Sequence, residues 1–101
     1  MKLKPGVKLT NLSSQMVLAA FIVDEIYADA ECTITSANDS KHSDASLHYK
    51  GCALDFRTKD YAGDKQALRD RIKAALGLDF DVVLEALGED NEHAHVEFDP
   101  K

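Results

Sequence analysis

Apolar positions recur at helical spacing in two segments of the chain. The first runs from a capping serine at position 13 or 14 to about Ala30. Its apolar stripe consists of Leu12, Met16, Ala19, Val23 and Ile26. The second runs from about Ala62 to Leu76 and ends at Gly77. Its stripe consists of Leu68, Ile72, Ala75 and Leu76. This spacing predicts two helices, each with one apolar face turned toward a core.

Four other segments are typical of strands. Residues 32–35 are short and β-branched, residues 53–57 alternate between apolar and polar, and residues 80–87 are rich in apolar side chains. Residues 93–98 alternate most clearly, with apolar side chains at 94, 96 and 98. The polar residues 36–46 predict a loop, residues 88–91 a turn, and residues 1–10 an N-terminal arm.

This order of elements predicts an α+β fold with a small antiparallel sheet and helices packed on one of its faces. A chain of 101 residues suits a single domain, spanning 1–101. The alternation leaves the other face of the sheet open, and it places four chemically useful side chains there: Asp55, His93, His95 and Glu97.

Composition and charge exclude several kinds of partner and location. The formal net charge of −6 disfavours nucleic acid, because its binding depends on cationic neutralisation of phosphate. No apolar run approaches the ~18 residues of a membrane span. The apolar segment after the first lysines resembles a signal peptide, but Asp24 and Glu25 interrupt it. We expect a cytoplasmic protein that binds neither nucleic acid nor membrane. Cys32 and Cys52 could form one bridge if they were adjacent in space, but we favour two reduced side chains.

Three of the four histidines fall within two short stretches of the chain. His48 and Asp55 would lie ~23 Å apart in a straight strand, so the chain must turn between them, as Gly51 permits. His95 would join them from the neighbouring strand. Each of these residues alone is better explained as a surface or hydrogen-bonding group. Together, two imidazoles and one carboxylate favour a zinc ion (Zn2+) with an open position for water.

The two stretches form a pair of motifs, Ser-x-His-x-x-Gly-x-Ala-x-Asp at 46–55 and Glu-His-x-His at 92–95. The pair resembles the zinc peptidases that act on bacterial cell-wall peptides. These are the D-alanyl-D-alanine carboxypeptidases and dipeptidases, together with phage endolysins of the L-alanyl-D-glutamate peptidase type. Residues 33–36 also resemble the strand that precedes the first motif in this family. The resemblance covers about 32–98 and implies the fold shared by hedgehog and D-Ala-D-Ala peptidase domains, with zinc on the open face.

The resemblance also implies roles for the motif residues. The family's zinc ligands match His48, Asp55 and His95. Glu92 matches the general base that activates water, His93 a residue that lines the site and stabilises the transition state, and Ser46 a residue that supports a ligand or the substrate. Glu97 shares a strand face with His95, whereas Glu92 has the opposite parity. Glu97 is therefore the alternative base, a support for a ligand, or a solvated edge residue.

One feature of the family is missing from this chain. The family usually carries an arginine in the loop after its Thr-Ser strand, where it binds the substrate's carbonyl or carboxylate. Residues 36–42 contain no arginine. Lys41, His42 or Arg57 could replace it, although His42 is equally explained as an ordinary loop residue.

The resemblance implies a zinc-dependent peptidase that hydrolyses peptidoglycan stem peptides. Such a protein would be phage-encoded, as an endolysin or part of a virion. It would be made in the host cytoplasm and would reach the cell wall through a targeting partner or a holin-type pore. The alternative is a catalytically weak or inactive zinc-binding module with the same fold, which would serve a structural or interaction role in a phage particle. A third hypothesis is a metal-free interaction domain. The sequence leaves open which peptide bond is cut.

Overall fold

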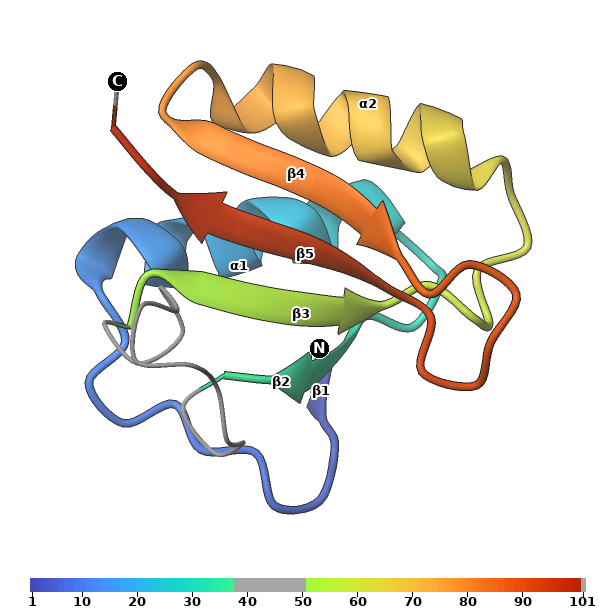
Figure 1. Cartoon of the computed structure of the whole chain (residues 1–101), viewed down its shortest axis with the longest axis horizontal. Helices are drawn as coiled ribbons and strands as arrows, with labels where there is room; N and C mark the ends of the chain where they lie inside the picture. Colours follow the sequence, from blue (N-terminus) through green and yellow to red (C-terminus); the bar gives the residue numbers. More distant parts are fainter. Residues whose placement is uncertain (38–50, 101) are drawn as a thin grey trace.

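The computed structural model describes residues 1–37 and 51–100. Within these ranges, two helices pack on a five-stranded sheet (Figure 1). The helices are α1 (Ser14–Tyr27) and α2 (Lys65–Leu76), and the strands are β1 (Lys2–Leu3), β2 (Thr33–Ser36), β3 (Ala53–Arg57), β4 (Phe80–Glu85) and β5 (His93–Phe98). The strand order is β1-β2-β3-β5-β4. The predicted α+β class is confirmed, with the two strands that carry the candidate site residues side by side inside the sheet.

The first residues of the chain are part of the sheet. Lys2 and Leu3 pair in parallel with Thr33 and Ile34, and the backbone N–H of Lys4 donates to the carbonyl of Ile34 at 2.9 Å. The sheet is therefore mixed, whereas the prediction was an antiparallel sheet with residues 1–10 as an arm. A strand of two residues is too short to show alternation, so the sequence pattern could not reveal it.

Helix α1 has the predicted start and ends earlier than predicted. The Ser13 hydroxyl accepts a hydrogen bond from the backbone N–H of Met16 at 3.2 Å, which satisfies one of the free donors of the first turn. The helix ends at Tyr27 because Ala28 takes a positive φ of 53°. Its buried face consists of Met16, Ala19, Ala20, Val23 and Tyr27. No helix in the described ranges is long and apolar enough to span a membrane.

Helix α2 begins later than the apolar pattern predicts. An Asp64 carboxylate oxygen accepts a hydrogen bond from the backbone N–H of Ala67 at 3.0 Å, and this cap fixes the first turn. The helix ends at Leu76 before Gly77, whose φ is 90°. Within the helix, Leu68 and Ile72 are fully buried in the core.

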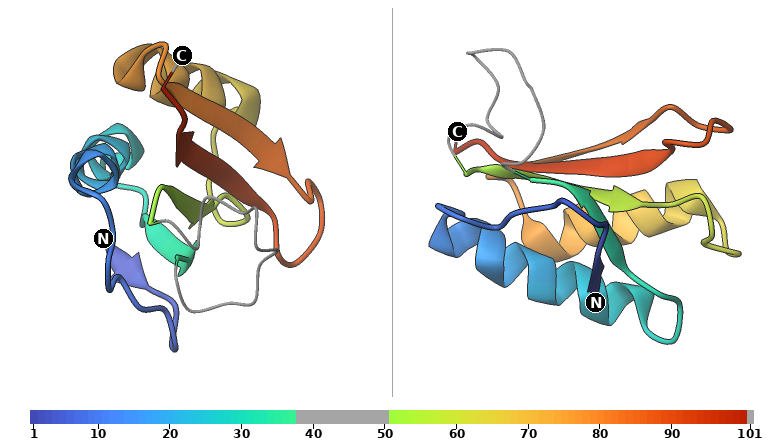
Figure 2. Two further views of the ribbon diagram at one scale, coloured as in Figure 1. Left: turned by 60° about the vertical axis from the view of Figure 1, so that its left-hand side comes forward. Right: turned by 90° about the horizontal axis from the view of Figure 1, so that it is seen from below.

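The two faces of the sheet have opposite characters. Leu54 and Phe56 of β3 and Ala94 and Val96 of β5 are fully buried, and both helices lie on that side (Figure 2). The core also contains Cys32, where burial raises the pKa of the thiol to about 12. No disulfide joins it to Cys52. The opposite face carries the polar positions of β3 and β5: Asp55, Arg57, His93, His95 and Glu97.

Candidate metal centre and groove

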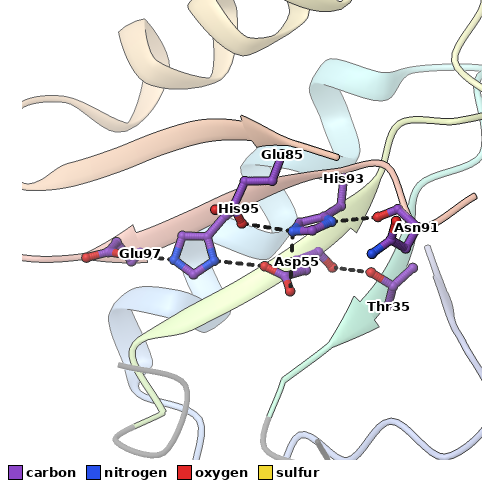
Figure 3. Close-up of polar contacts among 7 residues, drawn as sticks. All are labelled: Thr35, Asp55, Glu85, Asn91, His93, His95 and Glu97. Atoms are coloured by element: carbon purple, nitrogen blue, oxygen red, sulfur yellow. Dashed lines mark hydrogen bonds and ion pairs between the residues drawn. The ribbon is translucent and has the colours of Figure 1, made fainter. Parts of the chain in front are cut away.

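Asp55 and His95 form the centre of the candidate site. They occupy paired positions on β3 and β5, and paired residues of antiparallel strands project from the same face. His95 Nδ1 lies 2.9 Å from Asp55 Oδ1 (Figure 3). The hydrogen bond to Asp55 is the main cause that raises the pKa of His95 to about 9, and a weaker one to Glu97 adds to it. The carboxylate therefore both orients the imidazole and favours a positive charge beside it.

A second carboxylate contacts the other nitrogen of the same ring. Glu97 Oε1 lies 2.8 Å from His95 Nε2. A neutral imidazole has a single N–H, so it cannot donate to both carboxylates at once. Both contacts are satisfied when a second proton makes His95 an imidazolium, or when a metal ion takes the place of the proton at one ring nitrogen.

The donor set fits zinc. Ligand atoms of Asp55, Glu85 and His95 all lie within 4.8 Å of one another. Imidazole nitrogen and carboxylate oxygen are common zinc ligands, and three protein ligands leave a position for water or substrate. We therefore regard Asp55, Glu85 and His95 as the candidate metal centre among the described residues.

Glu85 was missing from the sequence-based prediction. It stands at the end of β4, opposite His93 in the register, and its Oε1 lies 2.9 Å from His93 Nε2. Knowing the register of the β4–β5 hairpin would have placed Glu85 opposite His93 and so beside the site. The connection over residues 86–92 is too long for turn chemistry to fix that register.

Glu92, the expected general base, does not join this centre. Its carboxylate is 4% exposed and lies 2.6 Å from the Lys65 ammonium group. It also accepts hydrogen bonds from the Thr58 hydroxyl at 2.7 Å and from the Gly88 backbone N–H at 2.8 Å. Lys65 contributes most to lowering the pKa of Glu92 to about 2, followed by Gly88 and Thr58. Glu92 thus ties the turn before β5 to the start of α2, and its catalytic role stays a prediction.

We expect the Glu92→Gln variant to be less stable than the native chain by ~2 kcal/mol at neutral pH, because it loses charge-assisted hydrogen bonds. The pKa of Glu92 is lower in the folded chain than its ordinary value of 4.5. Its stabilising contribution is therefore complete above pH 4.5 and is lost as the pH falls toward 2. Urea unfolding of both proteins across this range measures the difference. Glu89→Gln, in the same turn, is the matched control, and a difference that did not shrink in acid would contradict the assignment.

His93 and Arg57 line a groove that adjoins the centre. His93 Nε2 is 3.8 Å from Asp55 Oδ2, and its Nδ1 is 2.7 Å from the carbonyl oxygen of Asn91. Arg57 pairs with His93 in the register of β3 and β5. A cavity of about 400 Å³ opens here, and its lining includes Asp55, His93 and Arg57. A ligand in this groove would lie directly beside the candidate metal centre.

The remaining predicted site residues fall in the segment between β2 and β3. They are Lys41, His42, Ser46 and His48, and all four lie outside the described residues. The structure therefore brings Asp55, His93, His95, Arg57 and Glu97 to one face, and the zinc-ligand role of His48 stays a prediction.

Comparison with known proteins identifies the family. The chain matches the family model of the Hedgehog amino-terminal signalling domain over residues 8–96, a range that contains Asp55, Glu85 and His95. This family has a zinc-peptidase-like fold and belongs to the same superfamily as the carboxypeptidases that the motifs resemble, although the match is not to the carboxypeptidase family itself. No curated protein and no solved structure matches the chain. The matched range covers most of the chain, including the candidate metal centre. The chain therefore belongs to the family of the Hedgehog amino-terminal signalling domain.

Proposed function

We propose that this domain is a zinc-dependent peptidase whose substrates are the stem peptides of bacterial peptidoglycan. One observation carries the proposal: ligand atoms of Asp55, Glu85 and His95 lie within 4.8 Å of one another, beside a groove of about 400 Å³. The zinc-peptidase-like fold of the family supports the class of reaction. The resemblance of the motifs to cell-wall peptidases supports the class of substrate.

Asp55 and His95 would hold the zinc ion, with Glu85 or His48 as the third ligand. Bound zinc polarises a peptide carbonyl and lowers the pKa of water. The hydrogen bond at 2.9 Å between Asp55 and His95 fixes the orientation of the imidazole before any metal binds. His93 lies at the groove, with its ring held between Asn91 and Glu85. When Glu85 turns to the metal ion, Nε2 of His93 would be released from it and would donate a hydrogen bond to the substrate's carbonyl oxygen as negative charge develops.

Two glutamates compete for the role of general base. Glu97 projects from the same face as His95 and lies 2.8 Å from its ring. Glu92 would have to leave Lys65, which lies 2.6 Å away, before it could accept a proton at the groove. The contact of Glu97 with His95 favours Glu97, whereas the motif resemblance and the position of Glu92 in the lining of the groove favour Glu92. Cleavage measured in parallel for Glu92→Gln and Glu97→Gln separates the two, because only the variant that lacks the base should lose activity.

The test is mass spectrometry of defined muropeptides incubated with the zinc-loaded protein, beside a chelated sample and a His95→Ala variant. We expect a cleavage product that requires zinc and disappears in His95→Ala, and the mass of the product identifies the bond that is cut. The absence of any product from a protein shown to bind one zinc per chain would reject the peptidase.

A zinc-binding interaction module without turnover is the second candidate. The matched family is described as a signalling domain, and the carboxylate of Glu92 is already bound by Thr58 and Lys65 in a buried network. Zinc bound at one ion per chain, lower stability after chelation and no cleavage would support this candidate.

The expected origin and location of the protein remain predictions. These are a phage source, with the protein made in the host cytoplasm and delivered by a partner or a holin-type pore. Signalling domains of the matched family are normally secreted, which does not favour a cytoplasmic location.

A further inference from the structure

Helix α1 exposes apolar side chains on the side that faces away from the core. Its buried positions pack against α2 and the sheet, and its other side carries Val17, Leu18, Phe21 and Ile22, which are all exposed. Leu18 and Phe21 are each 65% exposed. Helix α2, by contrast, has no exposed large apolar side chain along its whole length. A surface helix normally turns polar residues outward, so the outer face of α1 is suited to being covered.

An apolar groove adjoins these side chains. It has a volume of about 340 Å³ and lies between the N-terminal segment and α1, and seven of its eight lining residues are apolar. Leu9 and Leu12 line it from the N-terminal segment, and Val17 and Phe21 line it from the helix. This face therefore presents an exposed aromatic ring beside a hollow that could receive another ring.

The size of this face matches one half of a protein–protein interface. Met1 and Leu9 are 48% and 38% exposed, and they extend the four helix residues along the groove. We call these six residues the α1 patch. Their exposed surface is roughly 600 Å², which is the upper end of what one apolar patch on a monomer exposes. With a polar rim added, it approaches the ~800 Å² that each partner buries in a standard interface.

Charge favours a second copy of the chain as the occupant of this face. Residues 1–31, which supply the whole α1 patch, contain three lysines and four acids, whereas residues 32–101 contain nine basic and fourteen acidic residues. Two copies that meet through α1 therefore bring together the segments with the least excess charge. Lys8 adjoins the patch before the start of α1, and Glu25 lies toward the end of the helix. Antiparallel helices would bring the lysine of one copy toward the glutamate of the other.

From these observations we infer that the domain forms a two-fold symmetric dimer through α1, in which Phe21 of each copy enters the apolar groove of the other. In such a dimer the same patch serves both copies. Residues 17 and 21 and residues 18 and 22 form rows with a spacing of four, and helices pack through such rows at a crossing angle of about −50°.

The dimer leaves both candidate metal centres accessible. Both helices lie on one side of the sheet (Figure 2), and Asp55 and His95 project from the other side. The inference therefore does not depend on the proposed peptidase activity, and a failure of the muropeptide assay would leave it unchanged.

The test is sedimentation equilibrium of the full chain, metal-free and zinc-loaded, over a range of ~5 µM to ~1 mM. We expect the mass to rise from that of one chain to that of two, with a dissociation constant of ~10 µM in both states. Amide chemical shifts of the ¹⁵N-labelled protein locate the contact without any substitution. On dilution they should change within residues 9–25 and stay constant within residues 93–98.

Variants of exposed residues test the contact directly. Phe21→Glu and Leu18→Glu should each weaken the dimer by ~100-fold or more, because each puts a charge into an apolar interface. Leu78→Glu is the matched control, since Leu78 is 83% exposed and lies outside the patch, and it should dimerise like the native chain. Urea unfolding reports whether each variant is folded.

Two results would overturn the inference: a single chain at every concentration, or a dimer of native affinity in folded Phe21→Glu and Leu18→Glu variants. Sedimentation with phosphatidylcholine vesicles, with and without phosphatidylglycerol, tests a lipid surface as the occupant instead. A chain that stays monomeric and binds vesicles only while Phe21 is present would assign the α1 patch to lipid and reject the dimer.

Discussion

Replacing Asp55 by alanine is expected to lower the zinc affinity of the domain by more than ~100-fold, because the change removes a ligand and a positioning group together. Asp55 contributes an oxygen to the candidate centre, and it also holds His95 Nδ1 at 2.9 Å. Asp55→Asn should lose less, since the amide oxygen keeps one acceptor but carries no charge. Competition with a chromogenic chelator measures both affinities, and metal analysis after dialysis gives the number of ions per chain.

The chain offers a matched control for this prediction on the same strands. A second group of acids, Asp81, Glu97 and Asp99, also brings three oxygens together. Asp81→Ala should leave the zinc affinity unchanged, because a set of three carboxylates without nitrogen suits hard cations better than zinc. Loss of zinc in Asp81→Ala together with its retention in Asp55→Ala would move the ion to that group and contradict the assignment.

The parts of the site that the sequence predicted are those governed by strand periodicity. In β3 and β5, alternation alone places Asp55, His93, His95 and Glu97 on the open face, and the observed register pairs Asp55 with His95. Glu92 precedes β5, where the parity of the strand need not hold; it is buried and also lines the groove. The resemblance assigns Glu92 to the site despite its parity; its carboxylate lies 2.6 Å from Lys65, and its role as general base stays a prediction.

The features that the sequence did not reveal depend on contacts between distant segments. Glu85 reaches His93 only because of the hairpin register, which the loop composition does not determine. The pairing of Lys2 and Leu3 with β2 joins residues about thirty positions apart through a ladder too short to leave a pattern. Among the described residues, the guanidinium of Arg57 has no ion-pair partner, and this is visible only once the contacts of the nearby acids Asp90 and Glu92 are known.

The Gly51→Ala variant is expected to lose ~2–4 kcal/mol of unfolding free energy, because it combines backbone strain with a steric clash. Gly51 has a φ of 70°, in the left-handed region that side chains disfavour. A Cβ at this position would lie 2.1 Å from the carbonyl oxygen of Asn11, a backbone atom that no rotamer change can move. The carbonyl of Gly51 also accepts from the backbone N–H of Ser13 at 2.9 Å, just before α1. Gly51 thus joins the start of β3 to the start of the first helix.

Urea unfolding of the Gly51→Ala and Gly88→Ala variants separates the backbone strain from the steric clash. Gly88 has a similar φ of 82°, but a Cβ there would meet nothing within 4 Å. Gly88→Ala should therefore cost only the strain, about 1 kcal/mol, and the difference between the variants measures the contact with Asn11. Equal losses would mean that the segment around Asn11 moves aside freely and that the contact does not hold β3 against α1. A larger loss in Gly51→Ala, together with weaker zinc binding at Asp55 four residues away, would show that this close approach of two backbones also positions the metal centre.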